Sequence, residues 1–199
     1  MTLANLKSSL GFNKVLLTIF TSFTLCACNQ DTADNRPSIA GLYTIESLVS
    51  EVEVAIGNNR ITSRDLMEQI EGFSYKTSFL VIRPNFTTDK NDNYKLITIP
   101  IPHPNITIHE PNSTDSFVIF TNNSLNGIGY TYEFNESTKT ITLIRPANHQ
   151  ETEKEWGRLE EIHVVDDNTL KSIVTKKYYD FNSAEWKDLN ITAIFKKAY

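Results

Sequence analysis

Cysteine is nearly absent from this chain, which has two cysteines among its 199 residues. They lie close to the start, at Cys26 and Cys28, and none follows them. A domain formed by the later residues therefore has no disulfide, no cysteine-ligated metal and no cysteine nucleophile. Its stability must come from an apolar core, and a chain of this length can bury one such core.

Glycine is scarce as well, at seven residues, and the motifs of many catalytic sites are missing. The chain has no glycine-rich phosphate loop, no G-x-S-x-G elbow and no H-E-x-x-H pair. The segment Asp89–Asn93 has alternating oxygen side chains but lacks the glycine and the distal glutamate of a calcium loop, which favours a solvated hairpin loop. The histidines do not stand at metal-ligand spacing: His103, His109, His149 and His163. The sequence thus predicts no enzyme, no cofactor and no metal site.

Positive charge is in deficit, with 19 lysines and arginines against 24 aspartates and glutamates. Lys7 and Lys14 are the charged residues of the first 27, so the net charge of −5 becomes −7 without that segment. An acidic domain of this kind argues against binding to nucleic acid or to anionic lipid headgroups.

Long apolar runs are missing too. The longest apolar stretch near the start, Val15–Leu25, is shorter than the about 20 residues that a helix needs to cross a bilayer. Lys7 and Lys14 precede it and small residues follow it, which is typical of an export signal. Ordinary cleavage after Ala27 would place the large Leu25 at a position that prefers a small residue.

The four residues Leu25-Cys26-Ala27-Cys28 resemble the lipobox of bacterial lipoproteins. This resemblance implies that the Cys28 thiol receives a diacylglycerol and becomes the N-terminus of the mature protein. We therefore expect a signal peptide at 1–27, a polar tether at 28–37 and a β-domain at 38–199. Two or three acyl chains on Cys28 suffice for stable membrane attachment. Asn29, in place of aspartate, implies export to the outer membrane by the rule of well-studied Gram-negative lipoproteins.

Beyond the tether, short β-rich runs alternate with turn residues. Ile39, Tyr43 and Ile45 are expected to face inward. The prolines of 100–104 remove alternate backbone donors, so that segment is expected at an edge or in a loop. The predicted strands are 38–50, 78–83, 94–101, 116–121, 130–134, 140–144, 159–165, 169–178 and 189–196, with loops at 135–139, 166–168 and 180–186.

One segment breaks the β pattern. Thr62 or Ser63 can cap a helix, Asp65 falls in its first turn, and Gly72 is a natural stop, so a short helix is expected at about 63–71. The order of elements predicts an all-β fold, an antiparallel up-and-down meander of 8–10 strands that closes into a barrel. A β-sandwich is the alternative. Closure is favoured because it removes exposed strand edges.

Three stretches are similar to lipocalin-like lipoproteins of Gram-negative bacteria. Gly41-Leu42-Tyr43 resembles the family's Gly-x-Trp, Val52–Ile70 resembles an acidic loop followed by a helix, and Trp186–Lys196 resembles the closing strand. The resemblance implies a lipocalin-like barrel that binds a small apolar or amphipathic ligand. The loop at 53–59 has no aspartate, unlike the family's acidic loop, and so gives no support to a cation site.

Aromatic side chains are the candidates for such a ligand site. They are Tyr43, Tyr130, Tyr132, Tyr178 and Trp186. Ordinary core packing is the competing interpretation. The alternative function is a cell-envelope protein that docks a protein or a glycan through its surface, either in the periplasm or facing outward.

Overall fold

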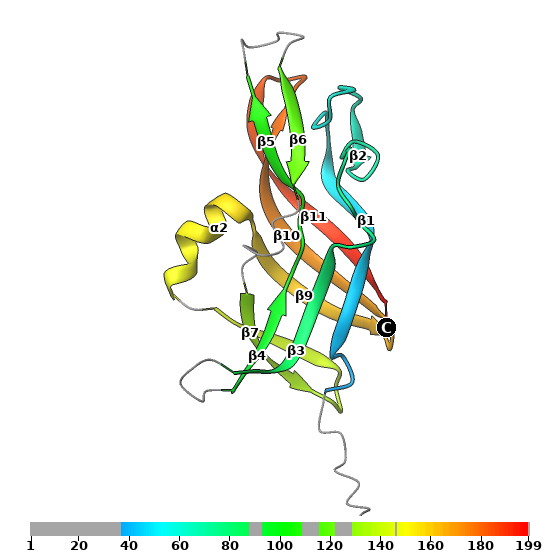
Figure 1. Ribbon diagram of the computed structural model, residues 1–199, viewed down its shortest axis with the longest axis vertical. Coiled ribbons are helices and arrows are strands. Elements are labelled where there is room, and N and C mark those ends of the chain that lie inside the picture. Colours follow the sequence, from blue (N-terminus) through cyan, green and yellow to red (C-terminus); the bar gives the residue numbers. More distant parts are fainter. Residues whose placement is uncertain (1–36, 88–92, 109–115, 122–128, 146, 199) are drawn as a thin grey trace, which may run out of the picture. The chain divides into compact units, whose positions relative to one another are not determined.

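The computed structural model describes residues 37–87, 93–108, 116–121, 129–145 and 147–198. Within them the chain is mostly β, and its strands form an antiparallel meander that is nearly closed into a barrel (Figure 1). The all-β barrel prediction is therefore confirmed. The strands of the main sheet are β1 Gly41–Val54, β2 Ser63–Asp65, β3 Phe79–Thr87, β4 Asn93–Thr98, β7 Gly129–Asn135, β8 Thr140–Ile144, β9 Arg158–Asp166, β10 Thr169–Asp180 and β11 Glu185–Lys197.

The main sheet runs in the order β8-β7-β4-β3-β1-β11-β10-β9, and β2 pairs with β1. Within the described residues, two further strands pair only with each other: β5 His103–Thr107 and β6 Phe117–Thr121. This arrangement agrees with the prediction that the proline-rich segment lies outside the centre of a sheet. The single turn η1 Ala147–His149 and the helix α2 Gln150–Trp156 lead into β9.

One seam separates β8 from β9, the two ends of the strand order. Arg145 bridges it, because its Nη2 donates to the carbonyl oxygens of Leu159 at 2.6 Å and Glu160 at 2.8 Å. The backbone N–H of Leu159 donates to the hydroxyl of Tyr130 at 3.0 Å. Side chains thus satisfy the backbone groups that a neighbouring strand satisfies elsewhere in the barrel.

The interior is filled by the inward residues of each strand. Side chains alternate across a strand, so every second residue of β10 and β11 faces the core. These residues are at most 2% exposed: Leu170, Ser172, Val174, Lys176, Tyr178, Leu189, Ile191, Ala193 and Phe195. Such low exposure means that the inner faces of β10 and β11 pack closely against the rest of the core.

The barrel has two ends, which we name by one residue each. The Ser38 end holds Ser38, the turn 136–139 and the turn 167–168, and the chain closes there because Ala198 N donates to Leu42 O at 2.8 Å. The Trp186 end holds the loop 55–62, the β5–β6 hairpin and the turn 181–184. Here Phe181 N donates to Ala55 O at 2.8 Å. In Figure 1 the Trp186 end is uppermost.

The helix predicted at about 63–71 is wrong. Ser63–Asp65 pairs with β1 instead, and a single turn follows in which Gln69 N and Ile70 N both donate to Leu66 O at 3.1 Å. The buried Gln69 side chain donates to Ser63 O and accepts from Ile56 N. Pairing with β1 therefore outweighs the local capping signal.

The other boundaries shift by a few residues. The predicted hairpins 130–134/140–144 and 159–165/169–178 are confirmed as β7–β8 and β9–β10. The predicted loop 180–186 shrinks to the turn 181–184, since Asp180 pairs with Glu185 and Tyr179 with Trp186. The strand predicted at 94–101 ends at Thr98.

Candidate functional site

Four of the five predicted ligand-binding aromatics lie in the barrel core. Tyr43, Tyr130, Tyr132 and Tyr178 are each at most 2% exposed. The Tyr43 hydroxyl donates to Ile39 O at 2.8 Å, and the Tyr178 hydroxyl donates to Pro102 O at 2.7 Å. Burial raises the pKa of Tyr43 to about 12 and that of Tyr178 well above its ordinary value. Both hydroxyls therefore stay neutral and act as hydrogen-bond donors inside the protein.

Tyr130 lies at the seam of the barrel. Its hydroxyl donates to a carboxylate oxygen of Glu153 at 3.0 Å and accepts from Leu159 N at 3.0 Å. Its pKa is raised, first by burial, although the Leu159 N–H works in the opposite direction. Tyr130 thus connects β7 to α2 and to the start of β9.

Tyr132 has a buried hydroxyl with no hydrogen-bond partner among the described residues, and so has Ser172 on β10. Burial raises the pKa of Tyr132 to about 12, and the nearby Tyr43 adds to the effect. A buried hydroxyl without a partner loses the hydrogen bonds that it makes with water in the unfolded chain. The Tyr75 hydroxyl and Nδ1 of His149 are also buried without a partner among the described residues, so these are four positions at which a polar atom of a small molecule would gain a hydrogen bond.

Trp186 does not join the tyrosines. It is 47% exposed, and its ring packs edge-on against Tyr179 with centroids 5.8 Å apart. Tyr179 in turn packs against Phe181 at 5.3 Å. The structure therefore separates the predicted set into a core group and one residue on the surface of the Trp186 end.

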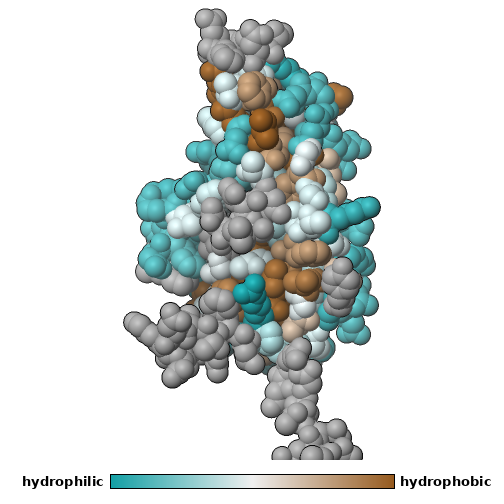
Figure 2. Space-filling model, viewed as in Figure 1, coloured by the Kyte–Doolittle hydropathy of each residue, from teal (hydrophilic) through white to brown (hydrophobic). Residues whose placement is uncertain are grey.

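Several exposed apolar side chains lie at that end, although others such as Ile144 and Val165 lie elsewhere on the barrel. Figure 2 shows brown, apolar atoms over β5 and β6, and other apolar atoms lower on the same face. Phe117 and Ile119 project outward from β6, at 42% and 57% exposure, and Ile61 in the neighbouring loop is 60% exposed. Together with Trp186, these residues form what we call the far-end apolar set.

The loop 55–62 joins the parts of this end. The Asn58 side chain donates to Val118 O at 2.9 Å and accepts from Val118 N at 2.8 Å, as a neighbouring strand would. The Arg60 guanidinium lies 5.3 Å from the centre of the Phe181 ring. The hairpin and the turn 181–184 are thus both held by one loop.

Asp180 is a buried carboxylate within this framework. It accepts hydrogen bonds from Ala55 N, Asn182 N and the Ser183 hydroxyl, and it pairs with Lys187 Nζ at 2.6 Å. Burial opposes ionisation of Asp180, but the hydrogen bonds from Lys187 and Asn182 outweigh it and lower the pKa. Asp180 therefore remains charged and fixes the turn 181–184 to Ala55, the first residue of the loop 55–62.

Lys176 is a second buried charged residue, at 2% exposure, on the inward face of β10. Its Nζ donates to Trp156 O at 2.8 Å and lies 3.3 Å from Nδ1 of His103. The His103 ring stacks on the Trp156 ring with centroids 4.4 Å apart. The three residues come from β5, the end of α2 and β10, and we call them the Lys176 cluster.

Desolvation dominates the electrostatics of this cluster. It lowers the pKa of Lys176 to about 7, against a smaller opposing effect of Glu155. The pKa of His103 is lowered by burial and then by Lys176. Sequence analysis missed the cluster, although strand alternation gave a signal, because Lys176 lies two residues from both Val174 and Tyr178 on one face.

The Ser38 end is polar and exposed. Glu136 accepts from Ser38 N at 2.7 Å and from the Ser38 hydroxyl at 2.9 Å, while Lys139 donates to Glu136 at 3.0 Å. Lys197 Nζ donates to Ser38 O at 3.1 Å. These bonds fasten the first described residues to the β7–β8 turn and to the end of β11.

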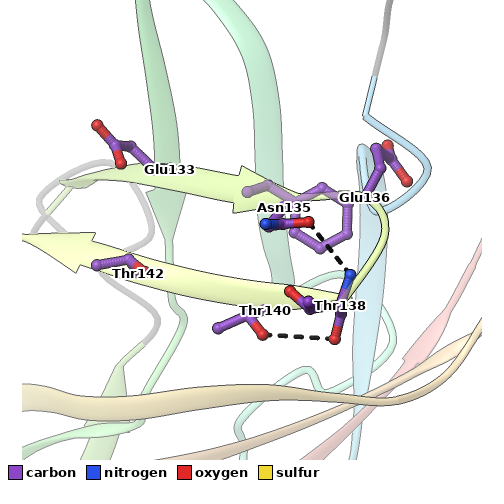
Figure 3. A pocket seen from close by; sticks show the side chains of 7 residues that line it. Glu133, Asn135, Glu136, Thr138, Thr140 and Thr142 are labelled. Carbon is purple, nitrogen blue, oxygen red and sulfur yellow. Dashed lines mark hydrogen bonds between the residues drawn. The ribbon is translucent and has the colours of Figure 1, made fainter.

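A surface pocket of about 610 Å³ lies beside the same turn (Figure 3). Its polar lining includes Glu133, Asn135 and Thr142. The Asn135 side chain accepts from Thr138 N at 3.2 Å, which is bonding within the turn itself. The polar groups of this pocket therefore serve to hold the hairpin turn together.

Several other predicted features fall on residues that the structure does not describe. Cys28, His109, and positions 89–92 of the Asp89–Asn93 segment fall outside the described residues. Among the residues that are described, no three histidine, cysteine or acidic side chains gather as metal ligands. The helices within the same ranges are too short or too polar to cross a bilayer.

Comparisons with protein-family models, with curated proteins and with solved structures gave no match. The similarity to lipocalin-like lipoproteins thus stays a prediction that rests on the three quoted stretches.

Proposed function

We propose that the chain is a lipid-anchored envelope protein that docks a protein partner through the Trp186 end of its barrel. The observation that carries this proposal is the far-end apolar set, Ile61, Phe117, Ile119 and Trp186, each at least 42% exposed. All four belong to segments of the Trp186 end, and exposed apolar side chains at one end of a domain are candidates for an interaction site. The closely packed inner faces of β10 and β11 favour this function over binding inside the barrel.

The predicted anchor at Cys28 limits how far the Ser38 end of the barrel can lie from the membrane. The first described residues, Pro37 and Ser38, lie at the Ser38 end. A Cys28 anchor would be joined to them by about nine residues, which reach at most about 30 Å when extended. The Ser38 end would then lie within about 30 Å of the membrane surface.

The composition of the set favours a protein over a glycan. Sugars stack on flat aromatic rings that are flanked by polar groups. Here Ile61 and Ile119, which are aliphatic, are the most exposed members. Aliphatic side chains contribute most when they are buried against an apolar protein surface.

Site-specific photo-crosslinking in cells tests the docking site. A photoreactive amino acid replaces Ile119, and in a control it replaces Val165 on β9, which is apolar and equally exposed at 58%. We expect one discrete crosslinked protein from position 119 and none from position 165. Identical products from both positions, or no product from position 119, would overturn the proposal.

The anchor is tested separately. Cys28→Ser should abolish metabolic labelling with a fatty acid and should release the protein from the membrane fraction. Cys26→Ser should leave both unchanged, since Cys26 precedes the proposed cleavage site. Labelling that survives Cys28→Ser would rule out Cys28 as the lipidated residue.

Binding of a small amphipathic ligand inside the barrel is the second candidate. The unpartnered hydroxyls of Tyr132 and Ser172 favour it, because a ligand oxygen would satisfy them. Native mass spectrometry of the protein released from membranes should then show a bound mass that Tyr132→Phe weakens. A spectrum with only the mass of the lipidated protein would exclude this candidate.

A further inference from the structure

The Lys176 cluster joins three elements that do not pair as strands. Lys176 lies on β10, His103 begins β5, and Trp156 ends α2. A second bond holds the same region, because the Tyr178 hydroxyl donates to Pro102 O at 2.7 Å. The hairpin β5–β6 is therefore attached to the barrel on this side by side chains of β10.

The 3.3 Å separation between Lys176 Nζ and His103 Nδ1 allows one positive charge and not two. When one group is neutral, the pair shares a hydrogen bond. When both are protonated, neither has a lone pair to accept, and two like charges stand in contact inside the protein.

No ion pair compensates this pair in the part of the chain that the structure describes, although Glu153, Lys154, Arg158 and Asp188 line a surface pocket together with Lys176. Among the described residues, Lys176 Nζ forms no ion pair with a carboxylate. Glu155 on α2 acts on both residues from a greater distance. From β11 the partner of Lys176 is Leu189, which is uncharged. From β5 the titratable group is His103 itself.

We propose that the Lys176–His103 contact is an acid-sensitive attachment that releases the β5–β6 hairpin from β10 when both residues are protonated. The attachment is closed in mildly alkaline conditions and opens in mildly acidic ones. It stands on this contact and does not depend on the proposed docking function. The lowered pKa values of both groups place the change near and below neutral pH.

Protonation would release only one side of the β5–β6 hairpin. On its other side the hairpin is held by Asn58, whose side chain bonds to Val118 N and Val118 O and does not titrate. The expected movement is therefore a separation of β5 from β10, with β6 remaining on the loop 55–62. The amides of β5 should respond more than those near Val118.

Hydrogen–deuterium exchange of the full chain in detergent micelles, at pH 8.5 and at pH 5.0, tests this inference. After correction for the intrinsic pH dependence of exchange, we expect the amides of 103–107 to exchange at least about tenfold faster at pH 5.0, because the two-stranded β5–β6 ladder loses its support from β10. Lys176→Met, which keeps the length of the side chain and removes its charge, should reduce this change to less than about twofold.

Lys177→Met is the matched control, since Lys177 is the next residue of β10 and its side chain is 51% exposed. It should respond to pH as the wild type does. As a second variant, His103→Phe keeps a ring against Trp156 and should also abolish the response. By NMR titration, the pKa of His103 should rise in Lys176→Met. An unchanged exchange rate in the wild type, or a full response in Lys176→Met, would overturn the inference.

Discussion

The two ends of the barrel are held together by different chemistry. At the Trp186 end the fastening groups are buried: Asp180 and Lys176 are at most 4% exposed. At the Ser38 end the corresponding groups are exposed, with Glu136 and Lys139 at 53% and 43%. Water competes for exposed charges, so bonds of the second kind contribute little to stability.

This difference shows which end depends on its polar bonds. A buried polar group that loses its partner is left without any hydrogen bond, whereas an exposed group is rehydrated. The Trp186 end is therefore fixed by a few groups whose loss is costly. The Ser38 end is kept in place by strand pairing, as between Tyr43 and Lys197, and its surface bonds add little.

The largest expected effect is the dependence of stability on pH through Lys176. Its pKa falls from 10.5 to about 7 on folding, so the stability of the wild type should decrease as the pH falls from 10.5 to 7. The decrease is on the order of 5 kcal/mol, at about 1.4 kcal/mol for each pH unit. Chemical denaturation at a series of pH values measures it. Lys176→Met should remove the slope and be the more stable protein at pH 7.

The tyrosines limit this trend at high pH. The pKa values of Tyr43 and Tyr132 are raised to about 12, so their contribution is complete below pH 10 and is lost as the pH rises toward 12. Stability should therefore be highest near pH 10. Parallel curves for the wild type and Lys176→Met would contradict the assignment of the slope to Lys176.

The next largest effect is expected for Asp180→Ala. The change removes four hydrogen-bond partners at the Trp186 end and should cost about 3 kcal/mol of unfolding free energy at pH 7. Denaturant titration measures the loss. Asp188→Ala, in which an exposed carboxylate 3.9 Å from Lys177 is removed, is the control and should change stability little. Equal losses of unfolding free energy in both variants would show that buried and exposed carboxylates stabilise the protein to the same extent.

Two tyrosine variants compare hydroxyls inside the barrel. Tyr178→Phe removes a buried hydrogen bond to Pro102 O and should cost about 1–2 kcal/mol. Tyr132→Phe removes a hydroxyl that has no partner among the described residues, and should be neutral or slightly stabilising. Thermal unfolding of both variants measures the difference. A clear loss in Tyr132→Phe would mean that a water or a ligand binds this hydroxyl.

The smallest effect is expected at the Ser38 end. Glu136→Gln weakens the bonds to Ser38 and Lys139, and it should leave the midpoint of thermal unfolding nearly unchanged because these groups stay hydrated. Hydrogen bonds to Ser38 and Lys139 lower the pKa of Glu136, so any effect should disappear in acid. A loss as large as that of Asp180→Ala would show that this end is also fixed by its polar bonds.

Sequence patterns predicted the barrel because apolar and polar residues alternate along its strands. Ile39, Tyr43 and Ile45 are expected to face inward and are all buried. Helices were harder to predict. The apparent helix near Ser63 became β2 because β1 offered backbone pairing, and α2 was missed because none of its residues is buried, so it has no apolar stripe.

The candidate site was less predictable than the fold. Sequence reasoning selected Tyr43 and Trp186 alike for their aromatic rings, although it expected Tyr43 to face inward on a strand and placed position 186 in a loop; the type of side chain alone does not separate a core ring from a surface ring. The contact between Lys176 and His103 joins residues 73 positions apart. Spacing in the sequence carries no information about such a pair. The contact depends on how the β5–β6 hairpin folds back over β10.

The seam between β8 and β9 also bears on aggregation. Exposed strand edges can template pairing with other chains, and a barrel with a gap has two of them. Arg145 occupies the carbonyl oxygens of Leu159 and Glu160, and Tyr130 occupies the N–H of Leu159. These bonds occupy backbone groups at the start of β9 with which an incoming strand would otherwise pair.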